Sequence, residues 1–278
     1  MLSRPPSTSA ESTTDETGAP TNVSGSSSDL ERSGTDSQHT EDPAVATDRS
    51  HLDEAIGASL AWYDDIHAMH GIRTVVRDGL WRSTGPALPW HSIAKTLHPD
   101  LRDDAVASAV ADRTDCSVAD TYGTLDLSPY GFTLLFEAQW LRHPGGPSTR
   151  GPHLPEQWSV IDSADRLATW SAIHDYAGVL TEEALSHPRL TVLARYQGMD
   201  MLAGAVLNDA GPTVGLSNLW SLDGHSSDVD GALAAAHTMY PGHPVTAYAQ
   251  GDELARLTQL GFVPLGPHRV WLRSGSTP

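Results

Sequence analysis

Cysteine, positive charge and long apolar runs are all scarce in this sequence. Cys116 is its one cysteine, so the chain cannot form an internal disulfide, and this favours a reducing compartment. Its apolar segments fall short of the roughly 20 residues that a membrane-spanning helix needs, and the N-terminus lacks the apolar core of a signal peptide. We therefore expect a cytoplasmic protein that has no membrane partner.

The charge is strongly unbalanced, because 35 acidic side chains stand against 17 basic ones and give a net charge of −18. Such a surface repels phosphate backbones, and no local basic cluster relieves the repulsion, so we expect no nucleic-acid partner. A cationic ligand is weakly favoured for the same reason. The hydrophobic fraction of 39% over 278 residues is enough for one or two globular domains.

Two low-complexity stretches divide the chain. Residues 1–50 are rich in Ser, Thr, Gly, Pro, Asp and Glu, and they have too little apolar area to offset the entropy of ordering, which predicts a disordered acidic tail. Residues 142–157 have the sequence RHPGGPSTRGPHLPEQ, which is typical of a linker. We therefore predict a first lobe over residues 52–143, a linker over 144–156 and a second lobe over 157–273.

The second lobe shows a regular order of helical and strand patterns. Near its end, Leu254, Leu257 and Leu260 recur at helical spacing, and Gly261 supplies the residue that ends the helix. A strand follows, and Gly266-Pro267 interrupts its ladder. The predicted elements, in chain order, are strand 157–162, helix 163–176, short helix 181–186, strands 189–197, 201–209 and 213–220, helix 227–240, strand 244–249, helix 251–260 and a final strand to residue 273.

This order of elements resembles the GNAT superfamily of acyltransferases. The segment MLAGAVLND resembles the family's third strand, and LARLTQLGFVPLG resembles its late helix with a Gly-Phe ending. The resemblance covers roughly residues 157–273. It implies an α/β fold with a mixed central sheet flanked by helices. It also implies an N-acyltransferase that moves an acetyl group from acetyl-CoA to the amine of a small molecule.

The resemblance further implies where acetyl-CoA binds. Its pantetheine arm would pair with the exposed edge of the fourth strand, residues 217–221, in a V-shaped opening beside the fifth strand. Its diphosphate would lie at the start of the next helix, where free backbone N–H groups and the helix dipole attract an anion. Leu257 stands where the family often has the tyrosine that protonates the departing thiolate, so Tyr248 on the fifth strand is the candidate catalytic residue. The candidate binding residues are Asn218, Leu219, Trp220, Ser221, Gly224, Ser226, Ser227 and Gln250.

The predicted diphosphate loop, SLDGHSSDVDGAL, departs from the family pattern because a single glycine precedes the helix. Asp223, Asp228 and Asp230 crowd the helix start, and like charges about 4 Å apart repel by about 4 kcal/mol at an effective dielectric near 20. Ser227 and Asp230 also have the spacing of a capping box, which predicts a self-capped helix. Two interpretations stay open: an active acyltransferase, or a degenerate member whose cleft holds another ligand or a protein partner.

The first lobe repeats a pattern of the second. Residues 116–143 echo residues 244–273, because in each a strand is followed by a Gly-Phe pair and then by a strand that contains Trp-Leu-Arg. We interpret the first lobe as a diverged copy of the C-terminal elements of the fold that forms the second lobe. The chain would then be a tandem of one partial and one complete copy.

The histidines predict no metal site. His67 and His70 share one helix face, but no third ligand has suitable spacing. The sequence leaves the acceptor amine and the oligomeric state open.

Overall fold

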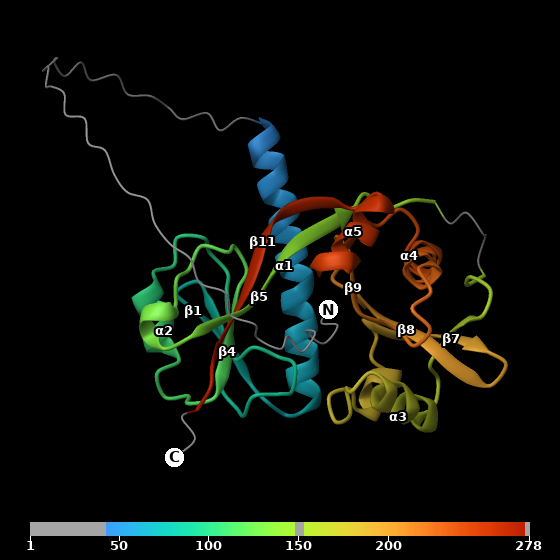
Figure 1. Ribbon diagram of the computed structural model, residues 1–278, viewed down its shortest axis with the longest axis horizontal. Helices are drawn as coiled ribbons and strands as arrows, with labels where there is room; N and C mark the ends of the chain where they lie inside the picture. The colour runs from blue at the N-terminus through green and yellow to red at the C-terminus, as the bar shows by residue number, and fades with distance from the viewer. Residues whose placement is uncertain (1–42, 148–152, 276–278) are drawn as a thin grey trace, which may run out of the picture.

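The computed structural model describes residues 43–147 and 153–275, with side chains from Arg49 onward. Within these residues, a single mixed sheet of eleven strands runs through both halves of the molecule, the first half being residues 43–147 and the second residues 153–275. Helix α1 (Pro43–Met69) stands between the halves (Figure 1). This helix begins inside the segment predicted as a tail, residues 1–50, and the rest of that segment lies outside the described residues. The predicted α/β fold with a mixed sheet and flanking helices is confirmed.

The first half supplies α1, a small antiparallel group of strands and one long strand. The remaining elements of this half are β1 (Thr74–Arg77), β2 (Leu80–Ser83), β3 (Ala94–Thr96), α2 (Asp103–Ala109), β4 (Cys116–Asp120), the 3₁₀ helix η1 (Ser128–Tyr130) and β5 (Thr133–His143).

The second half follows the predicted order of elements from its first strand to its last, which confirms that order. The interruption predicted at Gly266-Pro267 is a bulge inside a continuous strand, because the register shifts between Pro264 and Gly266. The elements are β6 (Trp158–Val160), α3 (Ala164–Ile173), the 3₁₀ helix η2 (Glu182–Leu185), β7 (Leu190–Gln197), β8 (Asp200–Asp209), β9 (Val214–Ser221), α4 (Ser227–Met239), β10 (Val245–Ala249), α5 (Gly251–Gln259) and β11 (Val263–Arg273).

The two halves exchange their last strands. The strand order is β1-β2-β3-β4-β11-β5-β10-β9-β8-β7-β6, so β11 lies between β4 and β5, and β5 lies between β11 and β10. Trp140 of β5 lies opposite Tyr248 of β10, and Trp271 of β11 lies opposite Val118 of β4. Each of the two Trp-Leu-Arg segments thus lies in an exchanged strand. That the first half is a partial copy stays a prediction.

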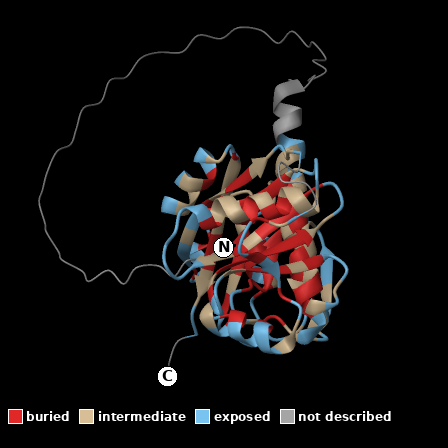
Figure 2. Cartoon of the chain, turned by 90° about the vertical axis from the view of Figure 1, so that its right-hand side faces the viewer, coloured by how far each residue is buried: buried red, intermediate tan, exposed pale blue. Residues whose placement is uncertain are grey.

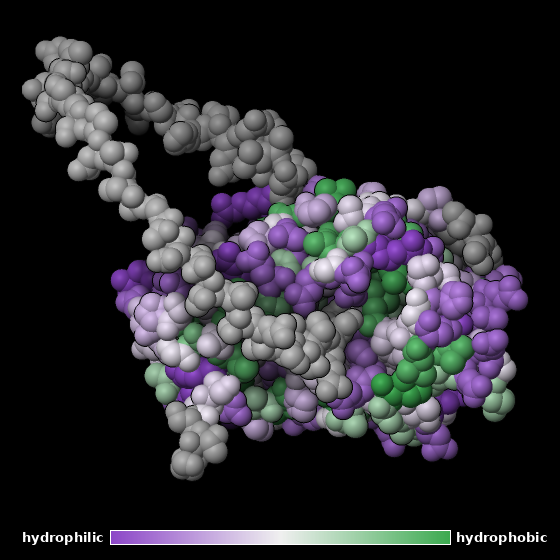
Figure 3. Space-filling view, in the orientation of Figure 1, coloured by the Kyte–Doolittle hydropathy of each residue, from purple (hydrophilic) through white to green (hydrophobic). Residues whose placement is uncertain are grey.

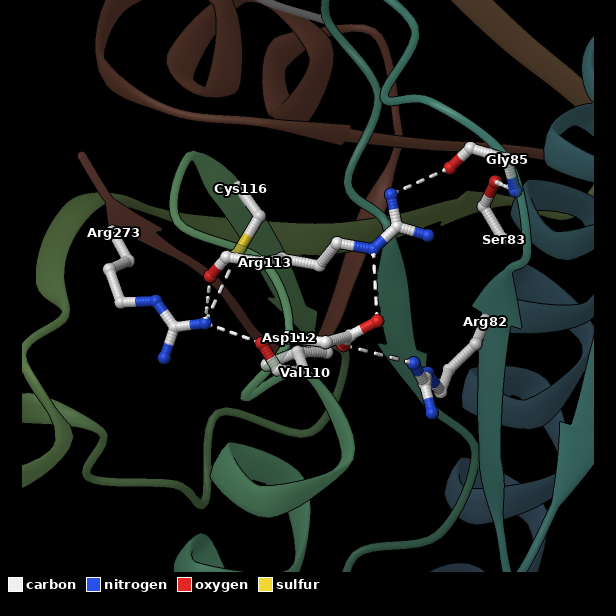
Figure 4. Close-up of polar contacts among 8 residues, drawn as sticks. All are labelled: Arg82, Ser83, Gly85, Val110, Asp112, Arg113, Cys116 and Arg273. Atoms are coloured by element: carbon white, nitrogen blue, oxygen red, sulfur yellow. Dashed lines mark hydrogen bonds and ion pairs between the residues drawn. The ribbon is translucent and has the colours of Figure 1, made fainter. Parts of the chain in front are cut away.

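Arg273 at the end of β11 ties this exchanged strand to the first half (Figure 4). Its guanidinium donates hydrogen bonds to the backbone carbonyls of Val110 and Arg113, and it lies 3.8 Å from the Sγ of Cys116. It also lies 4.6 Å from the centre of the Phe132 ring. The last strand is therefore held by charge-assisted hydrogen bonds as well as by the ladder.

The core has a layer on each face of the sheet, because successive strand residues point to opposite faces. In β7, Val192 packs with α1 and α3 while Leu193 packs with α4 and α5, and Val206 and Leu207 of β8 divide in the same way. In Figure 2 the buried residues, in red, fill the interior of the molecule. The visible face is largely hydrophilic, with apolar side chains gathered in a few places (Figure 3).

Helix α1 covers the seam between the halves. Ala55, Ala58, Trp62 and Ile66 are buried and recur every three or four residues, so they form one stripe along the helix. The helix contacts β5, β8, β9, β10 and β11. It therefore places side chains of the first half over the part of the sheet where the second half is expected to bind its substrate.

Candidate functional site

The parallel strands β9 and β10 separate soon after they meet. In the described part of the chain their ladder has two residue pairs, Val245 with Val214 and Thr246 with Gly215. Asn218 has a left-handed backbone with φ of 53°. The register between β8 and β9 shifts at this point, so that two residues of β9 oppose one of β8. This bulge bends the strand, and residues 216–221 are left without a partner strand on the β10 side.

The corresponding ladder of the first half, between β3 and β4, also has two residue pairs, but hydrogen bonds between two threonines continue the contact beyond it. Strands β3 and β4 pair at Ala94 with Val118 and at Lys95 with Ala119. Val118 corresponds to Tyr248, because each lies opposite the tryptophan of the exchanged strand. Beyond these pairs, the backbone N–H of Thr121 donates to Thr96 Oγ1 at 2.9 Å, and the Thr121 hydroxyl donates to the Thr96 carbonyl. The strands are joined where those of the second half are apart.

A small cavity of about 30 Å³ lies between α1 and the opening in the sheet. Ala58, Ser59 and Trp62 of α1 form one wall. Ser217 of β9 and Tyr248 of β10 belong to the opposite wall. The first half therefore closes one side of the space beside β9 and β10. That acetyl-CoA binds in a V-shaped opening there stays a prediction.

The predicted catalytic residue Tyr248 lines this cavity. Its ring lies 5.2 Å from the Trp140 ring and 4.6 Å from the His268 ring, measured between centres. Burial raises the pKa of Tyr248 well above its usual value, so the phenol keeps its proton at neutral pH. The side chain can thus donate a proton or a hydrogen bond, while its role as the proton donor stays a prediction.

The predicted binding residues of β9 lie around the bulge. Asn218 is buried, its Nδ2 donates to Ser217 Oγ at 3.0 Å, and its Oδ1 lies 3.3 Å from His174 Nε2. The Trp220 ring stacks near the His174 ring, with centres 6.3 Å apart. Gly204 opposite Trp220 leaves room for that indole, since a Cβ there would meet it at 2.4 Å. These side chains hold the bulge, so a ligand would meet the strand through its backbone.

The carboxylates at the start of α4 are paired with arginines, which the sequence analysis did not predict. Arg195 of β7 contacts Asp228 at 2.5 Å and Asp223 at 2.8 Å, and it lowers the pKa of Asp223 to about 2. Asp230 forms an ion pair with Arg256 of α5. The prediction of three uncompensated carboxylates was therefore wrong, because two arginines distant in sequence neutralise most of their charge.

The predicted capping box is also wrong. Asp230 points to Arg256, and the residue at the N-cap position, Ser226, makes no side-chain capping hydrogen bond. Gly224, Ser226 and Ser227 are exposed in this loop, and Leu219 and Ser221 lie on the β9 segment before it. Gln250 occupies the N-cap position of α5 with an extended backbone. The backbone N–H groups at the start of α4 are thus not used by a serine cap.

Sequence reasoning missed Lys95, although a simple count would have found it. Among 17 basic residues Lys95 is the one lysine, and its side chain is 1% exposed. Its Nζ donates a hydrogen bond to Ser59 Oγ at 2.6 Å and lies 3.7 Å above the centre of the Tyr63 ring. Burial lowers the pKa of Lys95 to about 7.

The positive charge of Lys95 is only weakly compensated by the groups around it. Asp64 is the carboxylate that acts on it electrostatically. That carboxylate already accepts hydrogen bonds from Thr74 at 2.7 Å and from Trp81 at 2.8 Å. Burial lowers the pKa values of His91 and His268 to about 3, so both rings are neutral.

The described residues contain no group of three or more side chains that could hold a metal ion. His67 and His70, the pair considered from the sequence, each contact a backbone carbonyl. Within 43–147 and 153–275, no helix is long and apolar enough to cross a membrane.

Comparison with known proteins identifies the fold. No protein-family model and no curated protein matches the sequence. A GCN5-related N-acetyltransferase from Kribbella flavida matches over 80% of this chain and 97% of its own, with 18% identity and a TM-score of 0.51. A protein classed as a GNAT-family acetyltransferase from Novosphingobium aromaticivorans matches over 81% and 97%, with 12% identity and a TM-score of 0.53.

A protein of unknown function from Staphylococcus epidermidis matches over 73% of this chain and 94% of its own, with 10% identity and a TM-score of 0.55. At these identities the likeness concerns the fold alone. The chain has the GNAT fold, and the matches extend over both halves.

Proposed function

We propose that the chain is an N-acyltransferase that moves an acetyl group from acetyl-CoA to the primary amine of a small molecule. The observation that supports this most is the opening between β9 and β10. It leaves the backbone of residues 216–221 without a strand partner on one side. The two amides of a pantetheine arm can hydrogen-bond to such an edge as an added strand does.

The cavity beside α1 would then receive the thioester. A neutral amine attacks the thioester carbonyl and the C–N bond forms. The nitrogen then loses a proton, which ends in solvent, the C–S bond breaks and the thiolate leaves. Tyr248 lines the cavity with a protonated phenol, and we propose it as the hydrogen-bond or proton donor to the departing sulfur. The amine and the thioester gain rate chiefly from being held together in the right orientation.

The diphosphate would lie at the start of α4, against the exposed segment that contains Gly224, Ser226 and Ser227. Arg195 offsets the charge of the carboxylates there. The rest of the proposed contact surface comprises Asn218, Leu219, Trp220, Ser221 and Gln250.

A degenerate protein that binds another ligand is the second candidate. It is favoured by the buried carboxylate of Asp228, which lies in the first turn of α4 where an anion would be held. The single cysteine and the acidic charge are consistent with our proposal of a cytoplasmic protein whose acceptor is a small amine.

The two candidates are separated by an assay of thiol release from acetyl-CoA. The full chain is incubated with acetyl-CoA and, in turn, glycine, ethanolamine, benzylamine and spermidine, and the acetylated amine is identified by mass. We expect at least one amine to accelerate thiol release. The variant Tyr248→Phe, which keeps the ring packing, should release thiol more slowly. No release with any amine, together with calorimetric binding of acetyl-CoA weaker than about 1 mM, about −4 kcal/mol, would favour the degenerate protein.

A further inference from the structure

Lys95 is unusual because it is buried and is the single lysine of the sequence. All other basic side chains are arginine, which stays charged throughout the accessible pH range and cannot accept a proton. Lysine differs in being able to lose its charge near neutral pH when it is buried. The chain therefore has a lysine at one position only, and that position is in the interior.

Ser59 connects this amine to the cavity. It lies on the stripe of α1 that faces the sheet, is partly exposed and lines the cavity together with Tyr248 and Ser217. Its Oγ is 2.6 Å from Lys95 Nζ. The Ser59 side chain therefore lies between the buried amine of Lys95 and the cavity that would hold the reacting groups.

The surroundings allow Lys95 to exist without a charge. Tyr63, Asp64 and His67 face it from α1, and His91 and His268 face it from a loop and from β11. Asp64 is engaged by two other donors, and the histidine rings are neutral because burial lowers their pKa values. Burial likewise brings the pKa of Lys95 to about 7, so a large fraction of the amine is neutral at neutral pH.

We propose that Ser59 and Lys95 form a proton relay for acyl transfer in the cavity of the second half. This inference rests on the proposed function. When the acceptor nitrogen has bonded to the thioester carbon, that nitrogen passes a proton to Ser59 Oγ. Ser59 passes its own hydroxyl proton to the lone pair of Lys95 Nζ. The C–S bond then breaks and the thiolate leaves. Once the products have left, Lys95 returns its proton through Ser59 Oγ to solvent in the cavity, so atoms and charge balance.

The relay also gives the first half a role. Its own seam between β3 and β4 is paired, so it offers no opening like that of the second half. It supplies Ser59 from α1 to the wall of a cavity formed largely by strands of the second half. Lys95 of β3 lies behind Ser59 and reaches the cavity only through its hydroxyl. Ser59 would touch the acceptor and is a catalytic residue in this scheme, whereas Lys95 acts through it as a positioning and proton-storing residue.

The state of Lys95 can be measured directly because it is the one lysine of the full chain. Protein labelled with ¹³C and ¹⁵N lysine gives one lysine side-chain signal, which is followed by nuclear magnetic resonance from pH 5 to pH 11. We expect a titration midpoint near 7. A midpoint near the value of about 10.4 of an exposed lysine overturns the relay.

Kinetics test whether this amine takes part in transfer. Wild type, Lys95→Met, Lys95→Arg and Ser59→Ala are compared with acetyl-CoA and the fastest amine of the panel. We expect kcat to fall about 100-fold or more in each variant, while the KM for acetyl-CoA changes less than threefold. Wild-type kcat should rise with pH through about pH 7, since the neutral amine accepts the proton, and this rise should vanish in Lys95→Met.

Two further comparisons separate the relay from a packing role. The double variant of Ser59→Ala and Lys95→Met should be no slower than the slower single variant, because the two residues act as one unit. Lys95→Arg retains a cation but cannot accept a proton, so activity at the wild-type level in that variant overturns the relay. A wild type that acetylates no amine refutes the proposed function, and the relay with it. A wild type that does so, with Lys95→Met equally fast, refutes the relay alone.

Discussion

Replacing Asp228 by Asn should strengthen the binding of acetyl-CoA. The Asp228 carboxylate is 3% exposed, lies in the first turn of α4 and contacts Arg195 at 2.5 Å. The substitution keeps the shape and a hydrogen-bond acceptor but removes one negative charge from the proposed diphosphate position. It also leaves Arg195 with a single carboxylate partner, Asp223, so that the guanidinium can donate a hydrogen bond to a phosphate oxygen.

The size of the effect follows from the charge removed. One unit charge about 4 Å from another is worth about 4 kcal/mol at an effective dielectric near 20. Because the loop is exposed, solvent and salt screen most of this, and we expect a gain of about tenfold in affinity, about 1.4 kcal/mol. Isothermal titration calorimetry with acetyl-CoA measures it. Asp165→Asn, which removes an exposed carboxylate from the start of α3, is the matched control. An unchanged affinity in Asp228→Asn, or an equal gain in the control, would refute the placement of the diphosphate.

Three other predictions concern stability. A fragment of residues 158–278 should not unfold cooperatively, as followed by circular dichroism on heating, because it lacks β5 between β10 and β11; a sharp transition would contradict the shared sheet. Arg273→Ala should lower the free energy of unfolding by about 2 kcal/mol in urea, since two carbonyls lose a charged donor, whereas exposed Arg77→Ala should change little. Stability should fall as the pH drops from about 6.5 toward 3, because His268 has a folded-state pKa of about 3, below its unfolded value. His268→Gln should flatten this part of the urea-midpoint profile, and an identical slope in that variant would argue against a buried neutral ring.

The elements of the second half could be predicted because their signals are local. Leu257 is buried as the helical spacing of the leucines requires, and Gly261 follows the helix with a left-handed backbone, φ 94°. The interruption of the last strand was also readable, since Gly266-Pro267 cannot continue a regular ladder and forms a bulge instead. The exchange of β5 and β11 could not be predicted, because the side-chain pattern of each strand is compatible with pairing in either half.

The site was predicted in outline, and its electrostatics were not. Tyr248 and the edge of β9 follow from the order of elements. Tyr248 lies at the cavity, as do the first two residues of that edge, Leu216 and Ser217. The contact of Arg195 with Asp228 joins residues 33 positions apart, and that of Lys95 with Ser59 joins residues 36 apart. No spacing rule relates such pairs, so the sequence shows three carboxylates as a repulsive cluster and does not reveal the Ser59–Lys95 contact.

The most direct test of the account is hydrogen–deuterium exchange of the full chain with and without acetyl-CoA. In the proposed complex, the thioester lies in the opening between β9 and β10, and the seam between β3 and β4 holds no ligand. We therefore expect acetyl-CoA to slow exchange in peptides that cover residues 216–221, with no change in peptides that cover residues 94–96 and 116–120. Slowed exchange at β3 and β4 alone, or no change in either region at saturating acetyl-CoA, would contradict the account.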